Sequence, residues 1–484
     1  MSYKGEAMMH PKAPRRTKII ATLGPASNTM ESLTPMIEAG VDLCRINFSH
    51  GNHTEQTQLI EIARQAADNA HKEIGIIADL QGPKIRVGRF EKAWVELVKD
   101  QDFILDCDKT TKGDASSVSV DYKNLFQDVQ PGDTLLLDDG LIEFKVLKID
   151  NKKIHCQVIT PGRLSDNKGI NKKGGGLSAG ALTDKDLEDL KQAINAKVDY
   201  IAVSFTRNAN DISITKQKII EAGGSAGVIA KIERAEAIEH IDEIINASDA
   251  VMVARGDLGV EIGLAEVPFV QKHIINRARA LDKAVITATQ MMESMITQPQ
   301  ATRAEVSDVA NAIIDGTDAV MFSAETAVGK YPVRVTQTVN EICLCAEKRP
   351  VTHRSRHRMN EQFDFKDEAI AMAVMYTANH YPVRAIISLT ESGATPLWMS
   401  RIRSNIPIYA LSRHIQTLRK ITLYRGVYPV AFDTTQAVGA ELRKKAIQCV
   451  KQQGLINDGD TVIITHGTQV GKEGGTDSMK VVEV

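Results

Sequence analysis

Residues 228–261 read VIAKIERAEAIEHIDEIINASDAVMVARGDLGVE, and this stretch decides the predicted fold. The apolar run Val228–Lys231 is typical of a buried strand, and a helical pattern follows it. A second apolar run, Ala250–Ala254, ends in a turn rich in glycine. Two consecutive strand–helix units of this kind indicate an α/β protein with parallel strands.

Charged residues stand at the carboxyl ends of these two strands. Lys231 and Glu233 are two residues apart, so their side chains leave the same face of an extended chain. Asp257 lies between two glycines after the second strand. Because ligands bind at this edge of an α/β sheet, two acids and an amine predict a site for a divalent cation and a phosphorylated anion. A surface salt bridge near two helix starts is the alternative interpretation.

Similar apolar runs alternate with amphipathic helical patterns on both sides of this stretch. The candidate strands are Lys18–Thr22, Val41–Ile46, Ile74–Asp79, Tyr200–Val203, Val228–Lys231, Ala250–Val253, Ala284–Thr287 and Ala319–Met321. Eight strands alternating with helices predict an α/β fold of the (β/α)8 TIM-barrel type over residues 17–82 and 181–349. An open doubly wound sheet is the structural alternative, and residues 1–16 are expected to form an N-terminal tail.

The barrel pattern is interrupted by residues 83–180, where short β-rich runs are broken by turn sequences such as Pro131-Gly132-Asp133. This pattern predicts an inserted all-β domain, a small barrel that follows the third strand and therefore lies over the carboxyl edge. Glycines border it at Gly82 and at 174–176, which suits a lid that closes on substrate and excludes water.

A polar stretch after about Arg349 reads as a linker into a third unit. Residues 350–484 alternate between helical and strand patterns and predict a small C-terminal α/β domain with a central sheet. Within it, Thr390, Ser392, Gly393 and Thr395 lie between a strand and a helix start, a pattern typical of a phosphate-binding turn. A plain capped turn is the alternative.

Composition excludes several classes of protein. Lys plus Arg is 59 and Asp plus Glu is 61, and this balance argues against a nucleic-acid or membrane-surface protein. No run of about 18 uncharged apolar residues predicts a membrane span, and the polar start lacks the apolar core of a signal peptide. Six scattered cysteines fit free thiols in a reducing cytoplasm, so we expect a cytoplasmic protein.

Other strand ends carry polar residues as well. Each of these loops could be a helix cap or a satisfied turn. In a barrel, however, all eight loops face one mouth, so we expect these side chains to converge. They are Arg45 to His50 after the second strand, Asp79 at the third, Thr289 after the seventh and Ser323 after the eighth.

Taken together, the loops carry motifs that resemble the pyruvate kinase family over residues 17–484. The motifs are CRINFSHG (44–51), DLQGPKIR (79–86), NKGIN (167–171), AKIERAEA (230–237), MVARGDLGVEIG (252–263), TATQMMESM (287–295), the long segment 300–327 and TVIITHG (461–467). The resemblance implies a TIM barrel, a mobile β lid and a C-terminal α/β effector domain. It also implies the last step of glycolysis, in which phosphoenolpyruvate and ADP give pyruvate and ATP.

The resemblance also implies roles for single residues. Glu233 and Asp257 would hold Mg2+, with Mn2+ as the alternative cation, because carboxylate oxygens suit such ions. Lys231 would stabilise charge on the transferring phosphoryl oxygens. Arg45 would bind the phosphoryl group. The backbone amides at Gly256 and Asp257 would bind the substrate carboxylate. Thr289 and Ser323 would lie on the side where the enolate carbon is protonated.

The nucleotide and monovalent-cation sites are implied in the same way. Asn47, His50, Arg86 and Lys185 would contact the nucleotide phosphates. Family members bind K+ through residues that match Asn47, Ser49, Asp79 and the Leu80 carbonyl. Here Lys84 stands where the K+-dependent members have glutamate, so we expect its ammonium to replace K+. A lysine of the lid hinge that faces water is the alternative.

The family resemblance also bears on regulation and on oligomeric state, in less detail than on the active site. The turn at Thr390–Thr395 resembles the family's effector loop, and the glycine-rich segment Gly471–Asp477 is expected to close over the same ligand. Ala394 stands where many members carry a basic residue, which favours AMP or a sugar monophosphate over fructose 1,6-bisphosphate. The resemblance also implies a homotetramer.

Two other functions remain as alternatives. A Mg2+-dependent aldolase or lyase acting on pyruvate enolate would need the metal and the acids, but no lid and no ADP site. A non-catalytic metabolite sensor would not need the intact Lys231, Glu233, Asp257 and Thr289.

Overall fold

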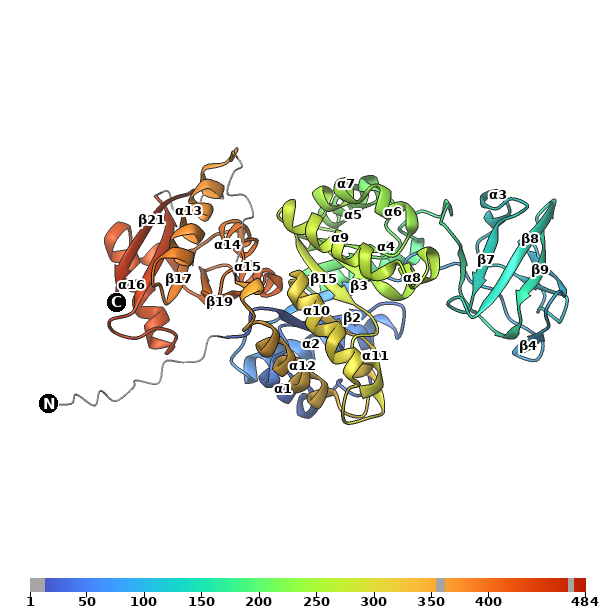
Figure 1. Cartoon of the computed structure of the whole chain (residues 1–484), viewed down its shortest axis with the longest axis horizontal. Coiled ribbons are helices and arrows are strands. Elements are labelled where there is room, and N and C mark those ends of the chain that lie inside the picture. Colours follow the sequence, from blue (N-terminus) through green and yellow to red (C-terminus); the bar gives the residue numbers. More distant parts are fainter. Residues whose placement is uncertain (1–13, 354–361, 469–473) are drawn as a thin grey trace.

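Parallel strands close into a barrel at the centre of the molecule (Figure 1). The computed structural model describes residues 14–353, 362–468 and 474–484. The strands are β1 (Lys18–Thr22), β2 (Leu43–Asn47), β3 (Gly75–Asp79), β12 (Tyr200–Val203), β13 (Gly227–Ile232), β14 (Ala250–Ala254), β15 (Ala284–Ala288) and β16 (Ala319–Phe322). Because β1 pairs with both β2 and β16, the sheet has no free edge. The predicted barrel is confirmed, and the open doubly wound sheet is wrong.

Helices surround the barrel strands. They are α1 (Met30–Ala39), α2 (His53–Asn69), α4 (Asp184–Asn195), α5 (Ala209–Glu221), α6 (Ala235–Glu239), α7 (Ile241–Ala247), α8 (Arg255–Ile262), α9 (Val267–Ala280), η1 (Glu293–Ile296), α10 (Arg303–Asp315), α11 (Ala324–Ala327) and α12 (Pro332–Ala346). Several begin with a capping box, in which two side chains satisfy free backbone amides at the helix start. At α2, the Asn52 side chain accepts from the amide of Glu55, whose carboxylate accepts from the amide of Asn52.

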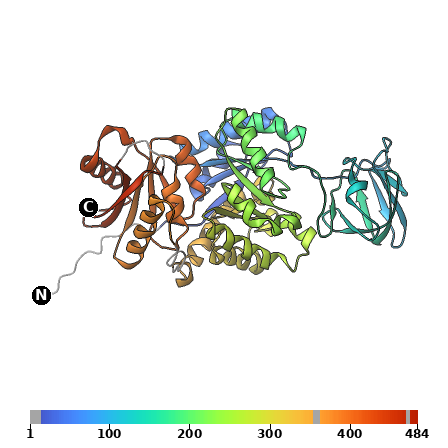
Figure 2. The same cartoon turned by 90° about the horizontal axis from the view of Figure 1, so that it is seen from above.

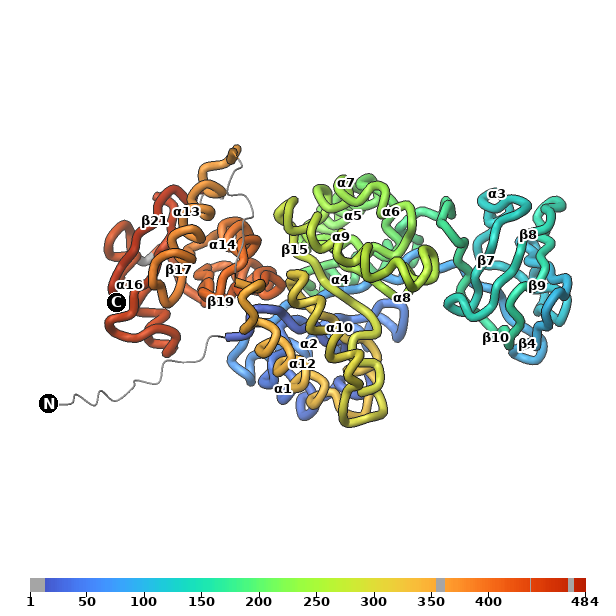
Figure 3. The backbone as a smooth tube through the Cα atoms, in the orientation of Figure 1, coloured from blue at the N-terminus to red at the C-terminus, as the bar shows by residue number. Residues whose placement is uncertain are grey.

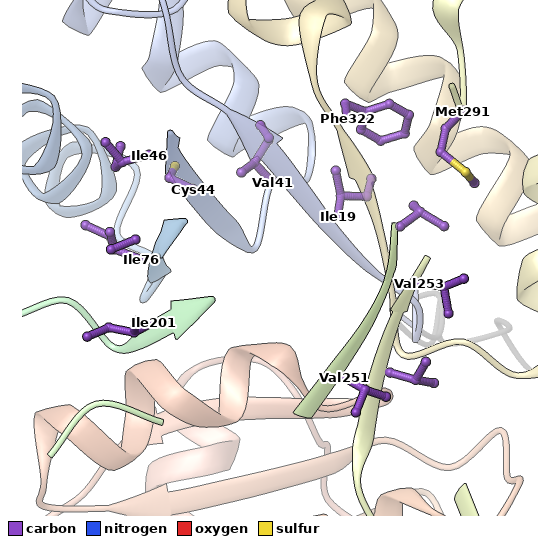
Figure 4. Packing of buried hydrophobic residues seen from close by; sticks show 14 of the residues in the cluster. Ile19, Val41, Cys44, Ile46, Ile76, Ile201, Val251, Val253, Met291 and Phe322 are labelled. Carbon is purple, nitrogen blue, oxygen red and sulfur yellow. The ribbon is translucent and has the colours of Figure 1, made fainter. Parts of the chain in front are cut away.

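Two apolar layers hold the barrel together. The outer layer lies between strands and helices and includes Ile19, Ile46, Val251 and Phe322, all buried (Figure 4). The inner layer fills the barrel itself with residues such as Ile229 and Met252. Since both faces of the strands are covered, their sequences are nearly continuous apolar runs. The barrel interior is therefore packed, and a ligand must bind at an end of it.

The inserted domain projects from one end of the barrel on two connecting segments (Figures 2 and 3). It holds a six-stranded sheet in the order β11-β7-β8-β9-β5-β6 and a two-stranded sheet of β10 and β4. Its elements are β4 (Trp94–Leu97), β5 (Asp102–Asp106), β6 (Ser117–Ser119), α3 (Leu125–Asp128), β7 (Thr134–Leu137), β8 (Ile142–Asp150), β9 (Lys153–Thr160), β10 (Gly162–Ser165) and β11 (Ile170–Lys172). Gly82 enters the insert with φ 68°, and 174–176 leave it with φ of 80–90°, a region that favours glycine.

The C-terminal unit is a sheet in the order β19-β18-β17-β20-β21 with helices on it. Its elements are η2 (Pro350–Thr352), α13 (Lys366–His380), β17 (Ala385–Leu389), α14 (Ala394–Ser400), β18 (Ile408–Ser412), α15 (Ile415–Lys420), η3 (Ile421–Leu423), β19 (Val427–Ala431), η4 (Thr434–Gln436), α16 (Gly439–Gln452), β20 (Thr461–Gly467) and β21 (Thr476–Glu483). The predicted central sheet is confirmed, and the antiparallel edge strand β21 is an addition to the prediction.

The C-terminal unit closes one end of the barrel. Leu423 packs inside the barrel with the strand residues, and the hydroxyl of Tyr200 donates to the carbonyl of Lys420 at 2.8 Å. A buried ion pair joins Arg401 to Asp318 just before β16. Because this end is filled, the opposite end, which carries the carboxyl ends of the strands and the insert, is the one open to ligands.

Some predicted segments fall partly outside the described residues. The predicted linker after Arg349 includes 354–361, and the glycine-rich segment Gly471–Asp477 begins within 469–473. Of the predicted tail, residues 14–16 are described. Arg16 is buried there, and its side chain donates to the carbonyl of Glu347 at 2.7 Å.

Candidate active site

A charged network lies at the carboxyl ends of β2, β3 and β13. Asp79 is its centre, with 1% of its side chain exposed. The guanidinium of Arg45 contacts one Asp79 oxygen at 2.6 Å, and the ammonium of Lys231 lies 3.2 Å from the other. Lys231 also contacts Glu233 at 2.9 Å. The structure therefore brings together four residues that the sequence placed on three separate strands.

Burial and charge set the protonation states in this network. Burial disfavours the Lys231 ammonium, but Asp79 and Glu233 outweigh burial and raise the pKa of Lys231 above its usual value. Burial also opposes ionisation of Asp79, yet Arg45 and Lys231 hold the pKa of Asp79 below its usual value. Burial raises the pKa of Glu233, and the nearby charge of Asp257 adds to this effect. Lys231 is thus a fixed positive charge.

Ser204 is a member of the network that the sequence did not reveal. Its hydroxyl accepts from Lys231 at 2.7 Å and donates to the carbonyl of Leu80 at 2.8 Å. The amide of Phe205 donates to Glu233 at 2.7 Å. Lone serines after a strand are common, so no local signal distinguished this one.

The turn after β14 forms the second part of the site. Asp257 lies in the first turn of α8, and the amide of Gly256 donates to the hydroxyl of Thr289 at 3.0 Å. Thr289 has φ 66° and Gln290 has φ 53°. This left-handed conformation costs roughly 1–2 kcal/mol for a residue with a Cβ, so other contacts must hold it. Ser323 follows β16 directly, and its amide donates to Glu325 at 2.7 Å.

Two carboxylates, Glu233 and Asp257, lie near enough for their charges to interact. Among the described residues, no group of three or more His, Cys, Asp or Glu side chains is arranged to hold a metal ion. The two acids fit Mg2+ nevertheless, since this ion commonly takes one or two carboxylates and completes its shell with water and substrate oxygens.

Lys84 reaches this site from the entrance to the insert. Its ammonium lies 3.0 Å from Asp257 and 3.4 Å from Asp139. The predicted K+ residues take other partners: Asn47 accepts from the amide of Ser49 at 3.1 Å, and Asp79 and Leu80 lie in the network above. The Lys84 ammonium therefore pairs with a predicted Mg2+ ligand. It makes no hydrogen bond or ion pair with the four residues of the predicted K+ site, all of which the structure describes.

The predicted nucleotide residues divide into two groups. Lys185 donates to the carbonyl of Phe48 at 2.8 Å, so it lies against the loop that carries Asn47 and His50. Arg86 lies in the insert, where its guanidinium donates to the carbonyl of Asn167 at 2.9 Å. The structure thus brings three of the four together and leaves Arg86 on the inserted domain.

A cavity of about 660 Å3 continues from this loop and was not predicted. Asn47, His50 and Gln56 supply polar atoms to its wall, and Pro25 and Leu59 supply apolar surface. Its residues come from the ends of β1 and β2 and the segments that follow them, from α2, and from the end of α11. No pattern in the sequence indicated this cavity, because apolar residues such as Leu59 also fit the face of a packed helix.

The predicted effector turn precedes α14. Gly393 has φ 88°, and its amide donates to the hydroxyl of Thr390 at 2.9 Å. The hydroxyl of Thr395 is buried and lies 2.7 Å from that of Thr476. The neighbouring Glu391 pairs with His414 at 2.6 Å. Both threonine hydroxyls therefore already have partners within the protein.

Comparison with known proteins gives the family. The family model described as the pyruvate kinase barrel domain matches residues 14–336, and the model of the pyruvate kinase alpha/beta domain matches residues 368–482. The chain belongs to the pyruvate kinase family. As a member of this family, it is a phosphotransferase enzyme. None of its described helices is both long enough and apolar enough to cross a membrane.

Similar members cover nearly the whole chain. The chain is 50% identical to "Pyruvate kinase II" of Salmonella typhimurium over 475 residues, which is 97% of this chain and 99% of the relative. It is 49% identical to the pyruvate kinase of Haemophilus influenzae, covering 94% of this chain and 96% of the relative. The crystal structure of a pyruvate kinase from Cryptosporidium parvum matches with a TM-score of 0.92 and 34% identity, covering 97% of this chain and 96% of that one.

Proposed function

We propose that this chain transfers the phosphoryl group of phosphoenolpyruvate to ADP, giving pyruvate and ATP in the last step of glycolysis. The arrangement of Lys231, Glu233 and Asp257 at one end of the barrel carries the proposal. The barrel, 17–82 with 181–349, would carry the chemistry, 83–180 would close over it, and 350–484 would bind an effector. We further infer a cytoplasmic homotetramer, on the grounds of the family resemblance.

Lys231 and Arg45 would receive the phosphoryl group. Both are cations held in place by buried carboxylates, so they offer fixed positive charge where negative charge develops during transfer. Glu233 and Asp257 would hold Mg2+, or Mn2+ as the alternative. When bound, the ion would neutralise negative charge that develops during phosphoryl transfer. The amides at Gly256 and Asp257, at the start of α8, would take the substrate carboxylate.

The enolate carbon would be protonated on the side of Thr289. Its hydroxyl accepts from Gly256 and donates to the carbonyl of Ala288 at 2.7 Å, so it is oriented before substrate binds. Either this hydroxyl or a water held by it would supply the proton. Ser323 would belong to the same relay.

ADP would place its phosphates near Asn47, His50 and Lys185 and its nucleoside in the adjoining cavity. The cavity supports this assignment because it joins polar atoms of the loop to apolar surface at Pro25 and Leu59, as a base and ribose require. Arg86 would add its charge when the insert closes, since it lies on that domain.

Lys84 would replace the monovalent cation that other members bind at residues matching Asn47, Ser49, Asp79 and Leu80. The contact between Lys84 and Asp257 supports this proposal, because it places a positive charge at the active site. That charge stands on the segment that leads into the insert. A phosphorylated effector, AMP or a sugar monophosphate, would bind the turn with Thr390, Ser392, Gly393 and Thr395.

A coupled assay tests the proposal. Pyruvate formation is followed with lactate dehydrogenase and NADH while ADP, Mg2+, K+ and candidate effectors are omitted in turn. We expect turnover that needs ADP and Mg2+ and proceeds equally in Tris, Na+ or K+ buffer. Pyruvate release without ADP would favour the aldolase or lyase instead, and a requirement for millimolar K+ would contradict the role of Lys84.

A further inference from the structure

Arg255 holds the strained turn that carries Thr289. Its Nε donates to the carbonyl of Ala288 at 3.1 Å, and its Nη2 donates to the carbonyls of Thr289 at 2.6 Å and Gln290 at 3.3 Å. These three consecutive carbonyls belong to the segment in which Thr289 and Gln290 adopt positive φ. One guanidinium therefore fixes the direction of three peptide planes around the threonine.

The other end of the guanidinium is tethered to the barrel wall. Nη1 donates to Asp308 of α10 at 2.8 Å and to Gln271 of α9 at 3.4 Å. The Arg255 side chain is 10% exposed, and that of Asp308 is 34% exposed. Only arginine can make this set of contacts, because its donors lie in a rigid planar fork, whereas a lysine ammonium presents one compact centre.

Arg255 also precedes Gly256 and Asp257 in the chain. The amide of Gly256 donates to the Thr289 hydroxyl, so backbone and side chain of this short segment contact the threonine from two directions. The proposed carboxylate turn and the proposed proton donor are thus joined in one unit across β14 and β15.

We propose that Arg255, anchored by Asp308, is a positioning residue for protonation of the enolate. This inference rests on the proposed function. In the step, C3 of the enolate gains a proton from the Thr289 hydroxyl or from a water bound to it, C2–O becomes a carbonyl, and the donor regains a proton from solvent. Arg255 touches neither substrate nor proton. It keeps the hydroxyl where C3 lies, and it leaves phosphoryl transfer at Lys231 untouched.

The test separates the two half-reactions in Arg255→Lys, Arg255→Met and Asp308→Asn. Rapid-quench measurements follow ATP and pyruvate in the first turnover. Proton NMR in D2O follows exchange of the pyruvate methyl protons, with Mg2+ and with inorganic phosphate as the occupant of the phosphoryl subsite. A displacement of about 1 Å costs on the order of 100-fold in rate, so we expect kcat and methyl exchange of Arg255→Met to fall by roughly that factor.

Phosphoryl transfer should persist in the same variant. We expect a burst of ATP ahead of pyruvate and a larger solvent deuterium isotope effect on kcat, because proton transfer becomes slower than phosphoryl transfer. The KM for phosphoenolpyruvate should stay within about threefold of the wild type, because substrate binding is unchanged. Asp308→Asn and Arg255→Lys should show the same pattern with smaller losses, and they keep the test available if Arg255→Met does not fold. The control is Arg277→Met, which removes the half-exposed ion pair between Arg277 of α9 and Asp242 of α7 and should leave every rate unchanged.

Two results would overturn the inference. If ATP formation and methyl exchange fall by one common factor with no burst, Arg255 serves the fold alone. If all three variants keep wild-type exchange, the contacts with 288–290 have no role in proton transfer. Failure of the wild type to make ATP from phosphoenolpyruvate would instead refute the proposed function.

Discussion

Replacing Glu261 by glutamine should stabilise the protein above neutral pH. Glu261 lies in α8 and is 3% exposed. One carboxylate oxygen accepts from the amide of Ala235 at 2.9 Å, and the other lies 3.5 Å from the side-chain amide of Asn171 at the exit from the insert. Burial, and next to it the charge of Glu236, raises the pKa of Glu261 to about 7.

The sign and size of the effect follow from proton linkage. In the unfolded chain this carboxyl titrates near its ordinary value of 4.5. Between that pH and about 7 the folded state binds a proton that the unfolded state has lost, so the free energy of unfolding falls as pH rises through this window. A shift from 4.5 to about 7 corresponds to roughly 3 kcal/mol at about 1.4 kcal/mol per pH unit. Glutamine has the shape of the neutral form and does not titrate.

Thermal unfolding of wild type and Glu261→Gln across pH 5 to 8.5 measures this difference. We expect a small Tm advantage for the variant at pH 5 that grows to roughly 6–12 °C at pH 8, using 2–4 °C per kcal/mol for a domain of this size. The control is Glu266→Gln, which changes an exposed carboxylate five residues further on. A Tm difference that stays constant over the whole pH range would refute the reasoning.

Four further substitutions test the site and the fold. Lys231→Met should lower kcat about 10^2–10^3-fold in the coupled assay, because the loss of one preorganised charge removes stabilisation of the transition state; an unchanged kcat would contradict its role. Asp257→Asn should raise the Mg2+ concentration for half-maximal rate at least about tenfold, and an unchanged Mg2+ titration would argue against coordination. Lys84→Met should lower turnover and regain part of it on addition of K+ but not of Na+. Asp318→Asn leaves Arg401 buried without its partner and should cost about 3–5 kcal/mol in the free energy of unfolding, read as a lower denaturation midpoint; an unchanged midpoint would show that the ion pair adds no net stability.

The barrel could be predicted because its signals are local. Buried parallel strands are short apolar runs, and strands such as β14 and β15 begin where these runs begin. The charged residues at strand ends could be predicted for the same reason. Once the barrel is assumed, Lys231, Glu233 and Asp257 must stand at one mouth, since every strand points the same way.

The partners of these residues could not be predicted, because they depend on contacts between distant parts of the chain. Lys231 and Asp79 are 152 positions apart, and Arg45 joins them from a third strand. Lys84 illustrates the same limit. Its charge was visible in the sequence, but its pairing with Asp257 depends on how the insert is attached to the barrel. Leu423 is an ordinary apolar residue until the C-terminal unit packs it into the barrel.

The ion pairs also hold the cations of the site in place before any ligand binds. Lys231 has two buried carboxylates within 3.2 Å, and Arg45 is fixed by Asp79. A phosphoryl group bound by these cations, as we propose, would share them with carboxylates already present, and this would weaken binding of the ground state. In return, the charges need not reorganise when negative charge moves during transfer, and this benefit belongs to the transition state. In the proposed function, a network with its cations already paired would therefore favour turnover over tight substrate binding.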